Sequence, residues 1–307
     1  MSKGFSAAAA VLATLLSAGA FLSCSNASGM TGLDAFVIYN GNGTPVSYEK
    51  MMQDISRSDV ILFGEMHNDP ISHWMELNIA KDLYYLKGDG LVIGAEMWEC
   101  DNQLTLDEFV LDSLMDMDTY VANSRLWPNF DTDYKPVLEF AAGNRIPFIA
   151  TNVPRKYANM VSKMGLGILD SLDTAAYSYM APLPIEVDYE DRLYEYVADF
   201  FKNMGGMPAK KSDVRNLVDA QALKDATMAY FITENREEDQ TFFHFQGELH
   251  SAYHSAIAYY IRKYAPGTKI STVSVEEAED PAKAKIEKGR ADYVVVVPLS
   301  MTRTYAD

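Results

Sequence analysis

Two tetrapeptides of the form Gly-Glu-x-His have the residue types and spacing best suited to chemistry in this 307-residue chain. They are Gly64–His67 and Gly247–His250, and each follows an apolar run. Glycine permits a tight turn or a close ligand approach, while a carboxylate and an imidazole can transfer protons or bind a metal. The repeat predicts a pocket that uses Glu65, His67 and His250. The alternative is structural: the glutamates cap helices and the imidazoles bond to backbone carbonyls.

Two more apolar runs lead into polar residues. Leu91–Ala95 is followed by Glu96, and Pro147–Ala150 is followed by Asn152 and Arg155. Ligands of open parallel sheets bind outside the carboxyl ends of the strands. If these strands are neighbours, their polar residues converge with both Gly-Glu-x-His motifs on one pocket.

His250 and His254 are four residues apart at the start of the amphipathic stretch Ser251–Tyr264. Helical spacing predicts that both imidazoles lie on one side, where they can chelate a metal or approach a flat cofactor. For His254, a partly buried helix histidine is an equal alternative. His244 lies within an apolar run and is expected to serve packing.

The elements that must position these residues alternate along the chain. The expected strands are Ala35–Tyr39, Val60–Phe63, Leu91–Ala95, Pro147–Ala150, Thr241–Phe245, Ile270–Val275 and Tyr293–Val297. The expected helices between them are Ser72–Leu86, Thr105–Met115, Asp133–Ala142 and Ser251–Tyr264. This order predicts an α/β fold, with a mostly parallel sheet and helices on both faces. Residues 185–236 contain two long helices, about 187–204 and 210–234, and are expected to form a helical cap insertion.

The composition excludes several classes of protein. The chain has 26 Lys and Arg against 43 Asp and Glu, a net charge of −17, so nucleic acid is not expected as a partner. Two cysteines cannot build a disulfide scaffold or a four-thiolate zinc site. There is no GxSxG, HExxH, GxGxxG after a strand or P-loop motif, which argues against common serine hydrolases, zinc peptidases, dehydrogenases and kinases.

The N-terminus has the pattern of an export signal. Residues 1–23 hold a single charge, Lys3, before an apolar, Ala- and Leu-rich stretch, and they are predicted to be a signal peptide. Cys24 follows directly, as in a bacterial lipobox, and is the expected site of lipidation. Residues 24–32 are then a short linker, and residues 33–307 a single α/β domain. A soluble secreted form and an uncleaved membrane anchor are the alternatives.

Several segments in order along the chain resemble the ChaN-like haem-binding lipoproteins, part of the superfamily that includes the Tiki and TraB proteins and the erythromycin esterases. These segments are Leu62–Leu77, Ile93–Gln103, Trp127–Ala141, Ile146–Ala158, Gln221–Ala229 and Gln246–His250. The resemblance implies a haem-binding lipoprotein for iron acquisition. It also implies lipid anchoring in the cell envelope of a Gram-negative bacterium, at the outer membrane.

The resemblance also implies how haem is held. In that family a tyrosine binds the iron at a dimer interface, and a histidine of the partner subunit assists. Tyr134 is the expected ligand and Tyr157 the reserve. A phenolate is a hard anionic ligand that favours ferric iron. The other candidates for contacting haem are His67, His250, His254, Asn152 and Arg155, the last of which suits the propionates.

Two other functions are compatible with the same residues. One is a peptidase or esterase of the Tiki or erythromycin esterase type, in which Glu and His side chains activate water directly or through a divalent metal ion. Its candidate residues are Glu65, His67, Glu96 and His250. The other is an interaction or structural lipoprotein with a vestigial pocket.

Overall fold

The computed structural model describes residues 34–204 and 211–305. Within these bounds the described residues form one compact unit. The predicted signal peptide, Cys24 and the linker lie outside the described residues, so they stay predictions. Among the described residues, no helix is both long and apolar enough to cross a membrane.

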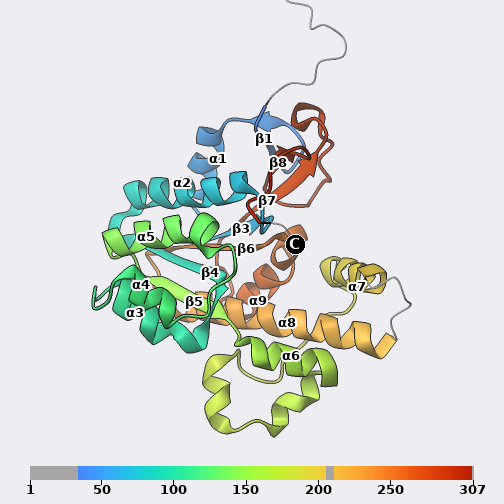
Figure 1. The fold of residues 1–307 in the computed structure, drawn as a ribbon. Coiled ribbons are helices and arrows are strands. Elements are labelled where there is room, and N and C mark those ends of the chain that lie inside the picture. The colour runs from blue at the N-terminus through green and yellow to red at the C-terminus, as the bar shows by residue number, and fades with distance from the viewer. Residues whose placement is uncertain (1–33, 205–210, 306–307) are drawn as a thin grey trace, which may run out of the picture. The chain divides into compact units, whose positions relative to one another are not determined.

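Eight strands form a single, mostly parallel sheet in the order β2-β1-β8-β7-β3-β6-β4-β5 (Figure 1). Strands β3 to β8 pair in parallel, and β1 pairs antiparallel with β8 and β2. All seven predicted runs form strands, and the short β2 is the addition. The bounds are β1 Val37–Asn40, β2 Pro45–Val46, β3 Val60–Glu65, β4 Leu91–Glu99, β5 Phe148–Asn152, β6 Thr241–Gly247, β7 Ile270–Ala278 and β8 Tyr293–Pro298.

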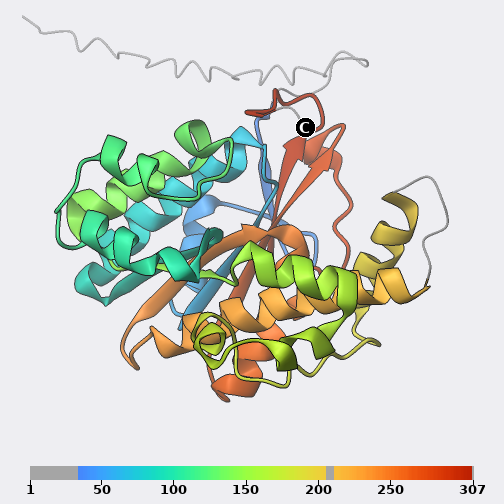
Figure 2. The same ribbon diagram turned by 60° about the horizontal axis from the view of Figure 1, so that its bottom comes forward.

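Helices cover both faces of this sheet, which confirms the predicted α/β architecture (Figures 1 and 2). Alternate strand residues point to opposite faces. Ile61 and Phe63 belong to the core under α1–α5, while Val60 and Leu62 belong to the core under α6–α9. The helices are α1 Tyr48–Ile55, α2 Pro70–Lys87, α3 Gln103–Val110, α4 Met117–Ala122, α5 Lys135–Asn144, α6 Arg155–Met164, α7 Arg192–Met204, α8 Lys211–Glu234 and α9 Ile257–Tyr264.

The segment predicted as a helical insertion contains α7 and α8. Helix α8 packs on α6, α9 and β5, so it covers the sheet as well as extending beyond it (Figure 1). Its middle residues therefore reach the carboxyl edge of the sheet, where the polar motifs lie.

The helix expected over 251–264 begins later than predicted. Residues Glu248–His250 and Ala252–His254 form separate 3₁₀ turns, and α9 begins only at Ile257. Tyr253 and His254 have φ values of 60° and 57°, in the left-handed region, which breaks a continuous helix. The helical spacing proposed for His250 and His254 is therefore wrong.

Candidate functional site

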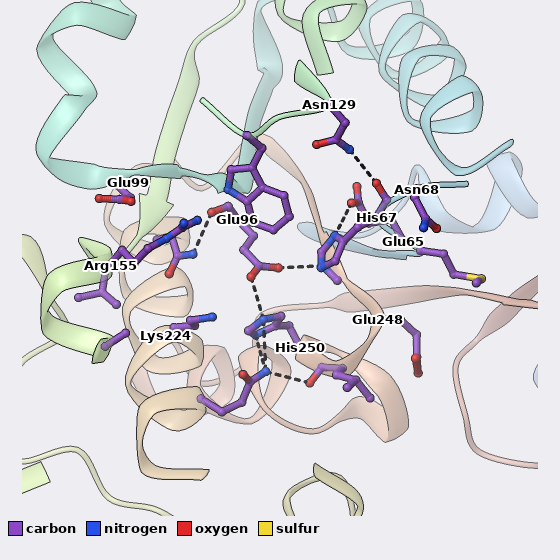
Figure 3. A pocket seen from close by; sticks show the side chains of 18 of the residues that line it. Glu65, His67, Asn68, Glu96, Glu99, Asn129, Arg155, Lys224, Glu248 and His250 are labelled. Atoms are coloured by element: carbon purple, nitrogen blue, oxygen red, sulfur yellow. Dashed lines mark hydrogen bonds and ion pairs between the residues drawn. The ribbon is translucent and has the colours of Figure 1, made fainter. Parts of the chain in front are cut away.

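A pocket of about 700 Å³ lies where β3, β6, β4 and β5 end (Figure 3). These strands are consecutive neighbours in the sheet. Their ends supply Glu65, Gly247, Glu96 and Asn152 to the pocket lining. The four strand exits thus converge as their sequence positions indicated, while the chemical roles of their residues stay predictions.

The two Gly-Glu-x-His motifs are packed against each other through their glycines. A Cβ atom on Gly247 would lie 2.8 Å from both Cε1 and Nε2 of His67. A Cβ atom on Gly64 would lie 3.0 Å from the Cα of Glu248 and 3.1 Å from Oγ of Ser251. Both positions therefore require glycine, because the two motifs approach each other closely. The His67 ring packs directly against Gly247.

His67 is the accessible imidazole of the pocket, with a side chain that is 43% exposed. Its Nδ1 lies 2.7 Å from Oε1 of Glu65, and its ring contacts that of Trp127 with centroids 4.9 Å apart. Burial lowers the pKa of His67, but the hydrogen bond and charge of Glu65 outweigh this and raise it. The ring is thus fixed by one nitrogen, and the structure shows no hydrogen-bond partner for Nε2 among the described residues.

The same oxygen of Glu65 accepts a second hydrogen bond. The hydroxyl of Tyr134, a fully buried residue, donates to Oε1 at 2.7 Å. Burial would raise the pKa of Glu65, but the nearby His73 ring and the hydrogen bond with His67 outweigh this and lower it to about 2. Burial raises the pKa of Tyr134, and the charges of Glu65 and Glu76 raise it further. Tyr134 is therefore a neutral phenol that orients Glu65.

His250 is held by two carboxylates and is only 4% exposed. Its Nδ1 lies 2.5 Å from Oδ1 of Asp225, and its Nε2 lies 3.0 Å from Oε1 of Glu96. Burial opposes charging of His250, but Glu96 and Asp225 raise its pKa to about 9. Burial likewise opposes charging of Glu96, yet His250 brings its pKa well below the usual value. Both nitrogens of His250 are occupied, so its role is to hold the pocket wall in place.

Four glutamates line the pocket, and each has a partner. Glu65 is held by His67 and Tyr134, and Glu96 by His250 and the backbone N–H of Gly247. Glu99 pairs with Arg125 and Glu248 with Arg290. The second motif therefore pairs its glutamate with an arginine, whereas the first pairs its glutamate with a histidine and a tyrosine.

Two cations in the pocket lining are available to a ligand. Arg155 lies at the start of α6 and Lys224 in the middle of α8, and both line the pocket (Figure 3). Neither forms an ion pair with another described residue, although Lys224 helps to lower the pKa of Glu96. The pocket of this acidic chain therefore offers positive charge to an anion.

Other predicted residues lie outside this pocket. Tyr157 is buried in the core between α6 and α8. His254, with a side chain that is 36% exposed, lies near Asp292 in a different hollow, because the left-handed backbone turns it away from His250. His244 is fully buried, with Oγ1 of Thr151 at 2.7 Å, and is a packed polar residue as expected.

Sequence reasoning missed Lys224 and Tyr305 in the pocket lining, and Asp225, which holds His250 from outside that lining. Lys224 and Asp225 lie in the segment 221–229, which carried part of the resemblance, but its charged residues were not singled out. Tyr305, near the end of the chain, lines the pocket and is 42% exposed. No local motif marks Tyr305, so the sequence held no signal for it.

The fold and the pocket define an α/β protein with a polar pocket at the carboxyl edge of a mostly parallel sheet. A family model described as "Haem-binding uptake, Tiki superfamily, ChaN" matches residues 51–261. The match spans well over half of the chain, so this chain belongs to that family. No curated protein matches the chain.

Three solved structures are similar to this chain to different degrees, and the first of them shows the same fold. A structure of ChaN of Campylobacter jejuni, described as showing cofacial haem binding, has a TM-score of 0.68 and 17% identity, over 86% of this chain and 98% of that one. A protein of Bacillus cereus has a TM-score of 0.45 and 13% identity, over 81% and 90% of the two chains. An erythromycin esterase mutant in its open conformation has a TM-score of 0.45 and 10% identity, over 81% and 78%.

Proposed function

We propose that this protein binds haem in the pocket at the carboxyl ends of β3, β4, β5 and β6, in the service of haem uptake. The observation that carries the proposal is the charge arrangement: every glutamate in the lining has a partner, while Arg155 and Lys224 do not pair with a described residue. A volume of about 700 Å³ suits a cofactor-sized ligand. Membership of the haem-binding family supports the same ligand.

The residues present fit the chemical groups of haem. Arg155 and Lys224 would meet the propionates through charge-assisted hydrogen bonds. Of the three histidines considered, His67 is the one that faces the pocket with an unoccupied nitrogen, since both nitrogens of His250 are occupied and His254 lies elsewhere. When bound, haem would supply an iron centre that accepts a nitrogen or oxygen ligand from the protein.

The family resemblance implied a tyrosine ligand, and the geometry distinguishes two tyrosines. Tyr134 could reach a bound ligand only if its hydrogen bond to Glu65 broke and it left a fully buried position. Tyr305 already lines the pocket. We therefore assign Tyr134 to positioning Glu65, and through it His67, and assign the tyrosine ligand to Tyr305.

Titrating the full chain with haemin and following the Soret band tests the contacts of Arg155 and Lys224 with the propionates. Losing one charge-assisted hydrogen bond costs about 1.5–3 kcal/mol, so Arg155→Met and Lys224→Met should each weaken binding by about tenfold or more. Lys156→Met is the matched control. Lys156 is an exposed cation next to Arg155 in sequence, but its ammonium group lies over the Tyr157 ring and does not line the pocket. Equal affinities in all three variants would contradict the proposed propionate contacts.

Export and lipidation at Cys24 are part of the proposal, and rest on the sequence of residues 1–24. The anchored location at the outer membrane and assembly into a homodimer are also part of the proposal, and rest on the family resemblance. Cys24→Ser should abolish incorporation of labelled fatty acid and release the protein from the membrane fraction.

Light scattering with and without haemin tests the dimer, which should form when haem is bound.

The hydrolase alternative is less well supported by the same geometry. A general base must be unprotonated at working pH. Of the candidate bases, His250 has both nitrogens occupied, and the pKa values of Glu65 and Glu96 are lowered, which makes these carboxylates weak bases. Ester and peptide hydrolysis lost in His67→Ala but present in the parent chain would support that alternative.

A further inference from the structure

A second polar cluster is buried behind the pocket, on the α2 side of Glu65. It contains His73 and Glu76 of α2, Glu65 at the end of β3, and Asp133 just before α5. All four residues are nearly inaccessible to solvent. Neither the pocket lining nor the proposed haem contacts use His73, Glu76 or Asp133.

Glu65 links this cluster to the pocket through its two different oxygens. Oε1 faces His67 and Tyr134, as described above. Oε2 has no hydrogen-bond partner and lies 3.8 Å from Nδ1 of His73. The haem pocket and the cluster therefore use opposite sides of one carboxylate.

The orientation of His73 is set from one side. Its Nε2 lies 3.3 Å from Oδ2 of Asp133 and 3.2 Å from the backbone oxygen of His67, so the proton of the neutral ring belongs on Nε2. That leaves the lone pair of Nδ1 facing Oε2 of Glu76 at 3.2 Å. Metal-binding histidines commonly have this arrangement, in which the second nitrogen donates to a carboxylate or a carbonyl.

Unsatisfied oxygens point to a missing partner. Glu65 Oε2, Glu76 Oε1 and Asp133 Oδ1 are buried without a hydrogen-bond partner. Burying polar atoms without partners is costly, and burying several carboxylates together is more so. A cation or a proton must offset this charge, and the lone pair on Nδ1 of His73 favours a cation.

We propose that Glu65, His73 and Glu76 bind a divalent first-row transition metal ion behind the haem pocket. One ligand atom from each residue lies within 4.8 Å of the others. Two carboxylates and one imidazole form a donor set that suits ions such as Mn²⁺ or Zn²⁺. Asp133 orients His73 from outside, and is itself held by Asn129 and Thr304. This site does not depend on haem binding.

Elemental analysis of the full chain tests the site directly. The protein is treated with a chelator, dialysed against MnCl₂ or ZnCl₂ and then against buffer. We expect one ion per chain, lost in Glu76→Gln and in His73→Gln. Asp133→Asn should weaken affinity by about 10–100-fold, as loss of an orienting partner does. Glu139→Gln, at an exposed position on α5, is the control and should bind as the parent chain does.

Two further measurements keep the result interpretable. The ion should raise the thermal unfolding midpoint of the parent chain but not of Glu76→Gln, and circular dichroism establishes that the variant is folded.

Glu96→Gln changes the pocket side and should retain the ion. No stoichiometric ion in the parent chain would overturn the proposal in favour of a proton shared by Glu65 and Glu76. An ion lost in Glu96→Gln but kept in Glu76→Gln would overturn it in favour of a site in the pocket. Haemin titration of the metal-free protein reports separately on the haem proposal.

Discussion

At the residue scale, the two Gly-Glu-x-His motifs are alike in sequence and different in role. In the first, Glu65 fixes an exposed His67, whereas in the second Glu248 turns to Arg290 and His250 is buried. Nothing in the tetrapeptide distinguishes them, because the difference comes from Asp225 on α8 and Tyr134 before α5. Sequence could therefore predict that both motifs contribute, but not which imidazole is available.

The histidine pKa shifts predict a maximum in stability against pH. His250 has its pKa raised to about 9 and so binds a proton more tightly when folded, which makes stability fall as pH rises from about 6.5 to 9. His244 has its pKa lowered to about 4 by burial, so stability falls as pH drops from about 6.5 to 4. At about 1.4 kcal/mol per pKa unit, each change is on the order of 3 kcal/mol.

Urea unfolding across this pH range measures both losses of stability. His250→Gln should reduce the loss between about pH 6.5 and 9, and His244→Gln should reduce the loss between about pH 6.5 and 4. The exposed His254→Gln is the control and should keep both. A loss between about pH 6.5 and 9 that is unchanged in His250→Gln would show that another group causes it.

Gly247 gives a second prediction at this scale. In Gly247→Ala the new methyl group would displace the His67 ring, since it would lie 2.8 Å from two ring atoms. Haemin affinity should fall by about tenfold or more, in line with losing a contact of about 1.4 kcal/mol. Gly143→Ala in α5 has open space around it and should instead stabilise the helix by about 0.5–1 kcal/mol. Unchanged haemin affinity in Gly247→Ala would place His67 outside the binding contacts.

At the element scale, apolar strands were predictable and helix starts were not. A strand such as β3 is signalled by its own residues, because both of its faces are buried. The start of α9 depends on two left-handed residues, Tyr253 and His254, held by tertiary contacts that no local pattern encodes. Lys224 and Asp225 escaped notice because their helix approaches the pocket only through packing of α8 on the sheet.

The start of α2 positions the buried cluster, and its cap can be tested. Asp69 is the N-cap residue, and its carboxylate accepts from the backbone N–H of Ser72 at 2.9 Å. Asp69→Ala should lower the free energy of unfolding by about 1 kcal/mol. Ser47→Ala at the N-cap of α1 is a matched comparison away from the site and should cost a similar amount. A stabilising Asp69→Ala would mean that relief of charge repulsion in the cluster exceeds the value of the cap.

At the scale of the whole molecule, the net charge of −17 gave a misleading view of the site. A sum over the chain argues against nucleic acid as a partner, but it does not show which charges in the pocket are paired. Its glutamates are paired by residues distant in sequence, such as Tyr134 with Glu65 and Arg290 with Glu248, and pairing of this kind cannot be read from composition. The α/β class, the strand exits and Arg155 followed from the sequence. Lys224, and the finding that neither cation pairs with a described residue, required the structure.

The central claim is that haem binds in this pocket beside His67. Titration of the full chain with haemin, followed by the Soret band, tests it most directly. The account predicts a saturable shift in the parent chain. In His67→Ala and in Tyr305→Phe the haemin affinity should fall by about tenfold or more, because a ligand contact worth at least about 1.4 kcal/mol is removed. The position of the Soret band of the bound haemin should also change. Tyr134→Phe should retain the shift with a smaller loss. No saturable shift in the parent chain would contradict this claim. So would a Soret band and an affinity in both His67→Ala and Tyr305→Phe that equal those of the parent chain.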